Sequence, residues 1–154
     1  FPRQIALGNW LAGAIMWHFA AMWVLVVNGI VYVALGFATG RFRRKLLPIY
    51  PSAVLHDAKA ALTFKLSHDD LSHYNAVQKV LYAGIIVTGV IIVLSGLSIW
   101  KPVQFQELTS LFGGYDTARY VHFFAMATIV GFLVVHVTLA LIVPKSLRAM
   151  IAGR

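Results

Sequence analysis

Three long stretches of the chain lack any charged residue, and apolar residues dominate all of them. They cover residues 4–40, 80–100 and 120–144, which are 37, 21 and 25 residues long. A transmembrane helix needs about 20 consecutive, mainly apolar residues. The pattern therefore predicts an all-α transmembrane helix bundle with three spans, over about residues 10–38, 75–100 and 118–143.

Proline residues lie just after the second and third predicted spans, where they end the helices, and within the long loop 39–74, where they interrupt regular structure. The loop contains Pro48 and Pro51, and Pro102 and Pro144 follow the second and third spans. Between residues 52 and 66, apolar residues recur mostly at spacings of three and four. This spacing fits a short amphipathic helix on the membrane surface, and a partly ordered loop fits it equally well.

Turn and cap residues refine the expected helix ends. Asn9 is a suitable N-cap for the first span, and Asp116 or Thr117 for the third. The pair Gly113-Gly114 predicts a turn in the connection 101–117. The length suits a single domain, 1–154.

Composition and charge placement support a membrane protein. Of the 154 residues, 60% are hydrophobic and 12% are charged, which is about half the charged fraction of a soluble domain. Ten of the 13 Lys and Arg residues lie between Arg41 and Lys79 or after residue 144, against three on the other side. The positive-inside rule then puts the loop 39–74 and the C-terminus in the cytoplasm. The basic residues are orientation signals, and no nucleic-acid partner is expected.

Three of the six histidines, His18, His122 and His136, fall inside predicted spans. Ionisable residues within a bilayer are costly, and their default interpretation is functional. The spans contain no acidic residue for a proton relay, whereas lone imidazoles between apolar helices suit a haem iron. The alternative is a histidine that only hydrogen-bonds a neighbouring helix. The absence of cysteine excludes disulfides, iron–sulfur ligation and thioether haem attachment.

The histidine spacing predicts two haem positions along one helix. His122 and His136 are 14 residues apart, so they share nearly the same helix face at a separation of about 21 Å. His18 lies in the same half of the bilayer as His122 and is its expected axial partner. If the third span starts at 118, however, His122 lies nearer the start of its helix than His18 does to the start of the first span. His136 has no such partner, so we expect a further histidine from a helix upstream of Phe1 or from another subunit. Glycines such as Gly96 let ring edges approach closely.

Several motifs, spread over nearly the whole chain, are shared with one family of membrane cytochromes. They are Gly8-Asn9-Trp10, Trp17-His18-Phe19, Asn28 to Tyr32, Gly40 to Pro48, Tyr74 to Lys79, Leu111 to Gly114, Arg119 to Phe123, Val135-His136-Val137 and Leu147 to Arg154. In these motifs the chain resembles the b-type cytochrome subunits of the thiosulfate-reductase and formate-dehydrogenase gamma type, in the bacterial cytochrome b561 group. The resemblance implies a multi-pass protein of the bacterial inner membrane.

The resemblance also implies a ligand set. Family members have four spans and two b haems held by four histidines; His18 matches the ligand of the second span, and His122 and His136 match the two ligands of the last. The first span, with the fourth ligand, does not occur in these 154 residues, so one ligand pair is complete. The family further implies a menaquinone or ubiquinone site at Asn75, Gln78 and Lys79. From the residues alone, a capped and solvated helix start explains these side chains as well.

The function expected from these features is electron transfer through haem between the quinone pool and a peripheral redox enzyme. That enzyme would be a molybdenum enzyme or an iron–sulfur protein, and this chain would not be catalytic on its own. The first alternative is a membrane anchor without a redox role. A small transporter is the second, although the spans lack the buried acids and broken helices typical of that class.

Overall fold

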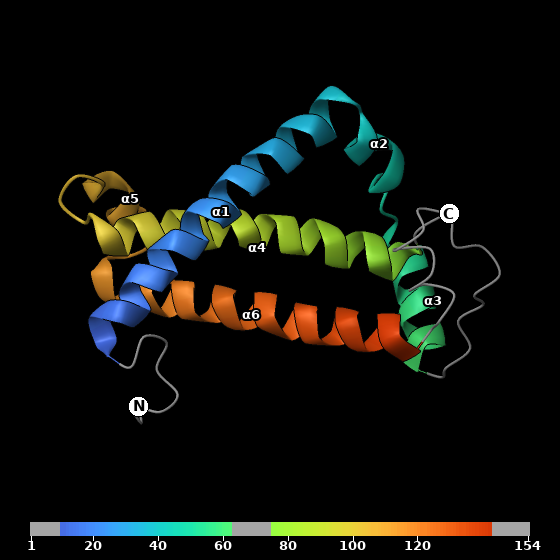
Figure 1. The fold of residues 1–154 in the computed structure, drawn as a ribbon. Helices are drawn as coiled ribbons and strands as arrows, with labels where there is room; N and C mark the ends of the chain where they lie inside the picture. The colour runs from blue at the N-terminus through green and yellow to red at the C-terminus, as the bar shows by residue number, and fades with distance from the viewer. Residues whose placement is uncertain (1–9, 63–74, 143–154) are drawn as a thin grey trace. The chain divides into compact units, whose positions relative to one another are not determined.

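The computed structural model describes residues 10–62 and 75–142 of the chain (Figure 1). Every regular element in these two ranges is an α-helix, which confirms the predicted fold class. In chain order the elements are α1 (Leu11–Ala38), α2 (Arg41–Lys45), α3 (Pro51–Leu62), α4 (Ala76–Trp100), α5 (Gln106–Leu111) and α6 (Tyr115–Ile142).

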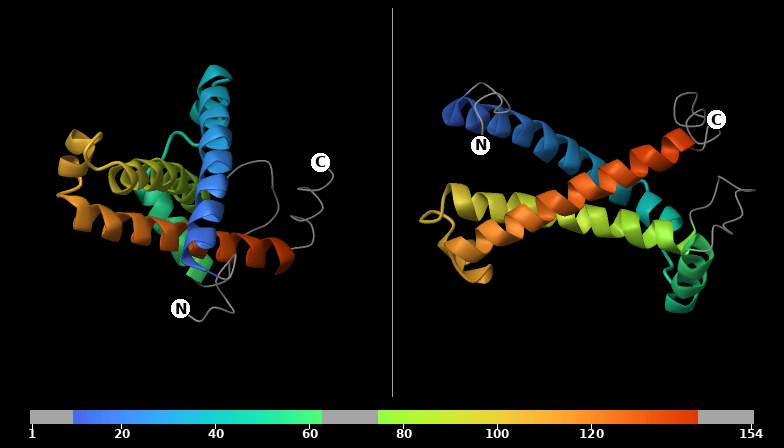
Figure 2. Two further views of the ribbon diagram at one scale, coloured as in Figure 1. Left: turned by 60° about the vertical axis from the view of Figure 1, so that its left-hand side comes forward. Right: turned by 90° about the horizontal axis from the view of Figure 1, so that it is seen from below.

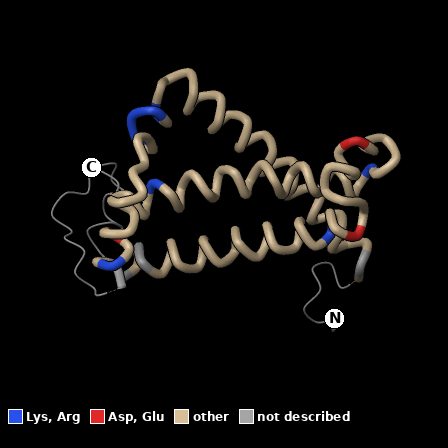
Figure 3. Tube along the Cα trace, turned by 180° about the vertical axis from the view of Figure 1, so that it is seen from behind, with Lys and Arg blue, Asp and Glu red and all other residues tan. Residues whose placement is uncertain are grey.

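Three of these helices, α1, α4 and α6, are long and apolar enough to cross a membrane. They correspond to the three predicted spans. Lys, Arg, Asp and Glu lie at the ends of the long helices and in the connections, and the stretches between carry none (Figure 3). Several hydroxyl side chains within the spans form local hydrogen bonds. The hydroxyls of Thr88, Thr128 and Thr138, for example, donate to the carbonyl oxygen four residues earlier.

The described residues form two compact units, divided between Phe42 and Arg43. In the first unit α1 follows Trp10 directly, and the expected cap residue Asn9 lies outside the described residues. The helix ends at Thr39, and Gly40 then turns the chain with a φ of 65°. The ring of Phe42 folds back onto the helix surface at Gly36, where a side chain would collide with it.

In the second unit α4 and α6 run antiparallel, side by side (Figures 1 and 2). Small residues make the contact: Ala118 is fully buried and Ala125 is 6% exposed. Most large apolar side chains of the pair point outward, as lipid-facing side chains do. Among the described residues, the largest fully buried side chains are those of two serines on α4, Ser95 and Ser98.

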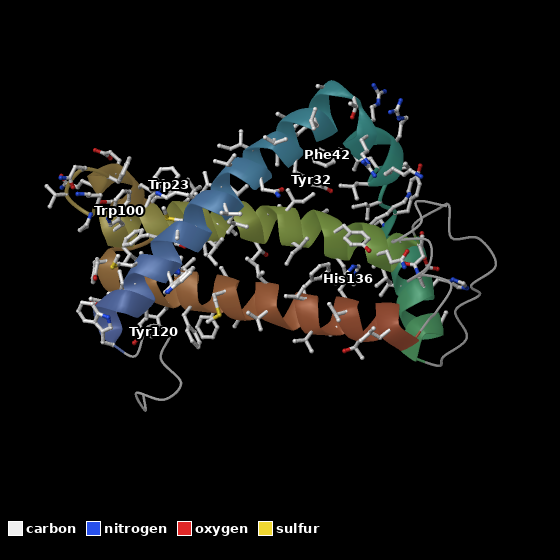
Figure 4. All side chains as sticks on the ribbon, in the orientation of Figure 1. Trp23, Tyr32, Phe42, Trp100, Tyr120 and His136 are labelled. Atoms are coloured by element: carbon white, nitrogen blue, oxygen red, sulfur yellow. The ribbon has the colours of Figure 1, made fainter. Side chains whose placement is uncertain are left out.

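One end of the pair, called the α5 end below, contains a helix that the sequence did not predict. The buried Thr109 of α5 donates its hydroxyl to the Phe105 carbonyl, at 3.0 Å, and to the Ser98 carbonyl at the end of α4, at 3.4 Å. The predicted turn at Gly113-Gly114 is confirmed, with φ values of 80° and 102°. Exposed Trp100 and Tyr120 lie at this end (Figure 4), as an aromatic belt at a membrane interface does.

The start of α6 differs from the prediction. The helix begins at Tyr115 instead of 118, so Asp116 and Thr117 lie in its first turn and are not caps. The reason is the positive φ of Gly114, which reverses the chain so that its carbonyl already accepts the Ala118 N–H at 3.0 Å. This shift moves His122 deeper into the helix than the sequence indicated.

At the opposite end, called the α3 end below, α3 lies against the start of α4. The Asp57 carboxylate of α3 accepts the Ala76 N–H at 2.8 Å, and so satisfies one of the open N–H groups of α4. A helix, one of the two structures expected for residues 52–66, is confirmed over Pro51–Leu62, and its position on the membrane surface stays a prediction. The rest of that stretch lies outside the described residues.

Candidate functional site

His122 on α6 points at the backbone of α4. Its Nδ1 lies 3.0 Å from the Ile92 carbonyl oxygen and 3.2 Å from the hydroxyl oxygen of Ser95. A carbonyl oxygen only accepts hydrogen bonds, so Nδ1 must carry the proton. That tautomer puts the ring's lone pair on Nε2, which is the form in which a neutral imidazole binds iron.

Ser95 and Gly96 shape the surface of α4 against which the His122 ring lies. The Ser95 hydroxyl is fully buried and donates to the Ile91 carbonyl at 2.7 Å, so its oxygen can accept from His122. A Cβ at Gly96 would lie 3.1 Å from Cε1 and 3.4 Å from Nδ1 of the His122 ring. At Gly96 it is the imidazole edge that approaches the helix, whereas a Cβ at Gly89 would meet nothing within 4 Å. A haem edge at either glycine stays a prediction.

His18 and His122 occupy the same position within their helices. Each lies seven residues after the first residue of its helix, Leu11 in α1 and Tyr115 in α6. At a rise of 1.5 Å per residue, both lie about 10 Å along the helix from its start. The unequal distances from the two helix starts, which a helix starting at 118 implied, are thus not present. The two histidines belong to different units.

His136, at the α3 end, is surrounded by aromatic rings. Phe132, one turn earlier on α6, stacks on it at a centroid distance of 5.6 Å and an interplanar angle of 9°. Tyr82 of α4 meets it edge to face at 6.2 Å and 75°. Figure 4 shows His136 beside α4, well away from Trp100 and Tyr120 at the α5 end. His122 and His136 are therefore at different depths of the same helix pair.

Comparison with known proteins decides the family. A family model described as prokaryotic cytochrome b561 matches residues 3–153. The chain belongs to the prokaryotic cytochrome b561 family.

A curated relative agrees with this cytochrome b561 membership. The chain is 50% identical over 152 residues to a protein of Azospira oryzae (strain ATCC BAA-33 / DSM 13638 / PS) named "Putative protein-methionine-sulfoxide reductase subunit YedZ1". The match covers 99% of this chain and 77% of the relative. No solved structure matches. The family and the three long helices make the chain a multi-pass membrane cytochrome of the b type, which takes part in electron transfer.

The residues of this cytochrome fit a b haem. A six-coordinate haem iron takes one imidazole on each face, so single histidines on separate helices, such as His18 on α1 and His122 on α6, are the donor set that it needs. No group of three or more His, Asp or Glu residues that could hold a metal ion occurs among the described residues. The hydrogen bond from Nδ1 of His122 to a backbone carbonyl is the outer contact typical of metal-binding histidines.

The three residues expected to bind quinone lie together at the start of α4. Asn75 and Gln78 form a reciprocal cap: Oδ1 of Asn75 accepts the Gln78 N–H at 2.8 Å, and Oε1 of Gln78 accepts the Asn75 N–H at 3.2 Å. Lys79 donates to the Pro48 carbonyl at 3.4 Å. The capped helix start is therefore present. Its hydrogen bonds use the two side-chain oxygens as acceptors, and the amide nitrogens are donors.

Four residues that contact the candidate site were not predicted from the sequence. Ser95 touches His122, Phe132 and Tyr82 touch His136, and Asp57 caps α4 beside Asn75. Phe132 carried a signal, since it precedes His136 by four residues and so shares its helix face. The other three depend on how separate helices align. His73, two positions before Asn75 in the sequence, lies outside the described residues.

Proposed function

We propose that this cytochrome carries electrons across the bacterial inner membrane, from quinol to a catalytic subunit on the outer side. The observation that carries the proposal is the close match to a reductase subunit over 99% of the chain. A reductase consumes electrons, so quinol is the donor. The orientation follows from charge: ten basic residues put the α3 end and the C-terminus in the cytoplasm, which makes the α5 end the outer one.

Two b haems would be held at the two depths that His122 and His136 mark. His18 and His122 would hold the outer haem, which their equal positions within α1 and α6 support. His136 would hold the inner haem from one side. Its partner would be a histidine from a further helix or from another subunit. The bound iron supplies a reversible one-electron couple.

Quinol would bind at the inner mouth of α4. The amide nitrogens of Asn75 and Gln78 can donate to its oxygens while their side-chain oxygens keep the helix capped. Tyr82 lies one turn beyond Gln78 on the same helix face, and it touches His136. An aromatic contact with the inner ligand thus begins one helical turn from Gln78. Each quinol oxidised releases two electrons, and its two protons leave to water at this mouth.

The outer partner would be the catalytic subunit of a protein-methionine-sulfoxide reductase. The name of the Azospira relative favours that class over a thiosulfate reductase or a formate dehydrogenase. Reduction of one methionine sulfoxide takes two electrons and two protons, and gives methionine and one water. The two electrons from one quinol balance this reaction. Substrate chemistry then belongs to the partner, and this chain supplies electrons.

The experiment is quinol-driven reduction of the purified complex, followed by optical spectroscopy. Added quinol should produce the absorption bands of reduced b haem, and a peptide containing methionine sulfoxide should then reoxidise them. His122→Ala should abolish reoxidation, because the outer haem is lost. His56→Ala is the control: this histidine is 85% exposed on α3, its ring contacts the Asp57 side chain at 3.3 Å, and it lies outside the spans, so reoxidation should persist. A wild-type protein without haem bands would instead support the membrane-anchor alternative.

A further inference from the structure

His122 makes more contacts with α4 than binding of an iron atom alone would require. The ring is held by two oxygens from successive turns of the same helix face, and its edge fits against a glycine. Neither oxygen comes from the helix that carries His122. The register of α4 against α6 therefore decides how the imidazole is oriented.

We propose that Ser95 is a positioning residue, which orients the His122 ligand of the outer haem, and that Gly96 leaves the space into which the edge of the His122 ring fits. This inference rests on the proposed function. Ser95 accepts from Nδ1 of His122 in a bifurcated hydrogen bond shared with the Ile92 carbonyl. The Ser95 hydroxyl is itself oriented by its bond to the Ile91 carbonyl. This chain of contacts sets the tautomer and the ring plane of His122.

The consequence for a bound haem is electronic. A hydrogen bond from the distal nitrogen of a metal-binding histidine makes the ligating nitrogen more basic. A more basic ligand favours the ferric over the ferrous iron, and so lowers the reduction potential. Loss of one of the two acceptors at Nδ1 should raise the potential of the outer haem and leave that of the inner haem unchanged. The remaining Ile92 carbonyl limits the size of the change.

Ser98 provides a matched control. Like Ser95 it is fully buried on α4, and its hydroxyl donates to the carbonyl four residues earlier, Leu94, at 3.1 Å. It lies one turn nearer the α5 end, whereas Nδ1 of His122 is hydrogen-bonded to Ser95 and Ile92. Ser95→Ala and Ser98→Ala therefore remove the same group from the same kind of surroundings. They differ in the contact with the proposed ligand.

The glycine offers a second, independent comparison. An alanine at Gly96 would place its Cβ 3.1 Å from the His122 ring, so the ring must shift. An alanine at Gly89, on the same helix, meets nothing within 4 Å. Both variants add the same methyl group to α4 and raise its helix propensity equally. They differ in whether the imidazole is displaced.

The test is a spectroelectrochemical titration of the holoprotein, together with electron paramagnetic resonance of the ferric haems. Ser95→Ala should shift the midpoint of one haem upward, by a threefold to tenfold change in its reduction equilibrium, while Ser98→Ala leaves it in place. A tenfold change corresponds to about 59 mV for one electron. The g values of that haem should also move, because they report the orientation of the imidazole planes.

Equal midpoints in wild type, Ser95→Ala and Ser98→Ala would overturn the inference, and so would equal shifts in both variants. If Ser95→Ala does not accumulate, the Gly96→Ala and Gly89→Ala pair decides: the inference requires a shifted or lost outer haem in the first and wild-type behaviour in the second. His122→Ala separates the two proposals. If it keeps every haem, the ligand assignment itself fails; if it loses one while the serine variants match wild type, the positioning role alone fails.

Discussion

The two ends of the α4–α6 pair hold their histidines by different means. At the α5 end, His122 is hydrogen-bonded to a backbone carbonyl and a buried hydroxyl of the facing helix. At the α3 end, His136 lies between the stacked ring of Phe132 and the edge of Tyr82. The two residues are of one type, on one helix and 14 positions apart. Their surroundings nevertheless constrain different properties of the imidazole.

A hydrogen bond to an oxygen that only accepts fixes which ring nitrogen carries the proton. Ring stacking fixes the plane of the imidazole, and contributes roughly 0.5–1.5 kcal/mol per aromatic pair, without selecting a tautomer. The hydrogen bonds of His122 therefore influence the basicity of its other ring nitrogen. The ring contacts of His136 instead fix the orientation of its imidazole plane. Polar residues around His122 and aromatic residues around His136 should accordingly give different kinds of defect when they are replaced.

The largest expected effect is that of His136→Ala. The inner haem would lose the ligand that this chain supplies, so one haem should disappear and electron transfer from quinol should fall at least a hundredfold. The outer haem should keep its midpoint potential, because His122 and its contacts on α4 are unchanged. Haem content and quinol-oxidation rate measure the result. A protein that retains both haems and its rate would show that His136 is not a ligand.

Phe132→Ala should sharpen the comparison, since it removes the stacked ring and leaves the ligand in place. We expect inner haem content to fall severalfold and its resonance signals to broaden, because the imidazole plane is no longer fixed. Leu133→Ala, an exposed position next along α6, is the control and should behave like wild type. Narrow, unshifted signals in Phe132→Ala would mean that stacking does not orient His136.

The proposed quinone site can be tested without breaking the helix cap. Asn75→Asp and Gln78→Glu keep the side-chain oxygens that accept the capping N–H groups, and remove the amide donors. Each should slow quinol oxidation about twofold to tenfold, since one hydrogen bond contributes roughly 0.5–1.5 kcal/mol. Thermal stability should stay close to that of wild type. Unchanged quinol kinetics in the double variant would exclude these amides from the site.

The smallest effect should come from Asp57→Ala at the α3 end. The variant leaves the Ala76 N–H without its carboxylate acceptor, and should lower the free energy of unfolding by about 1 kcal/mol. Asp57→Asn retains an acceptor oxygen and should lose less. Thermal unfolding in detergent compares the two with wild type. An Asp57→Ala protein as stable as wild type would show that this link between α3 and α4 is dispensable.

The long helices and the span histidines could be predicted from sequence because both depend on local pattern. A run of uncharged apolar residues indicates a span, and an imidazole inside it is unusual enough to notice. The start of α6 could not be predicted as well, because Gly113 and Gly114 each take a positive φ and the helix resumes at once. Helix α5 is only six residues long, too short to show a period.

The contacts around the histidines were beyond sequence reasoning for a different reason. Ser95 is one of several hydroxyl residues in the spans that donate to their own helix, and its sequence context does not distinguish it from Ser98. Only the register between α4 and α6 brings one of them to His122. Tyr82 and His136 likewise meet through that register. Residues that act across helices therefore required the structure.

Near-infrared magnetic circular dichroism of the ferric holoprotein is the sharpest test of whether His122 binds haem iron through Nε2. Wild-type protein should show the charge-transfer band of bis-histidine haem, and His122→Ala should lose the part due to one haem, with a matching fall in the haem-to-protein ratio. Ser98→Ala should leave both unchanged. A His122→Ala protein with the wild-type band and the wild-type haem ratio would contradict the account.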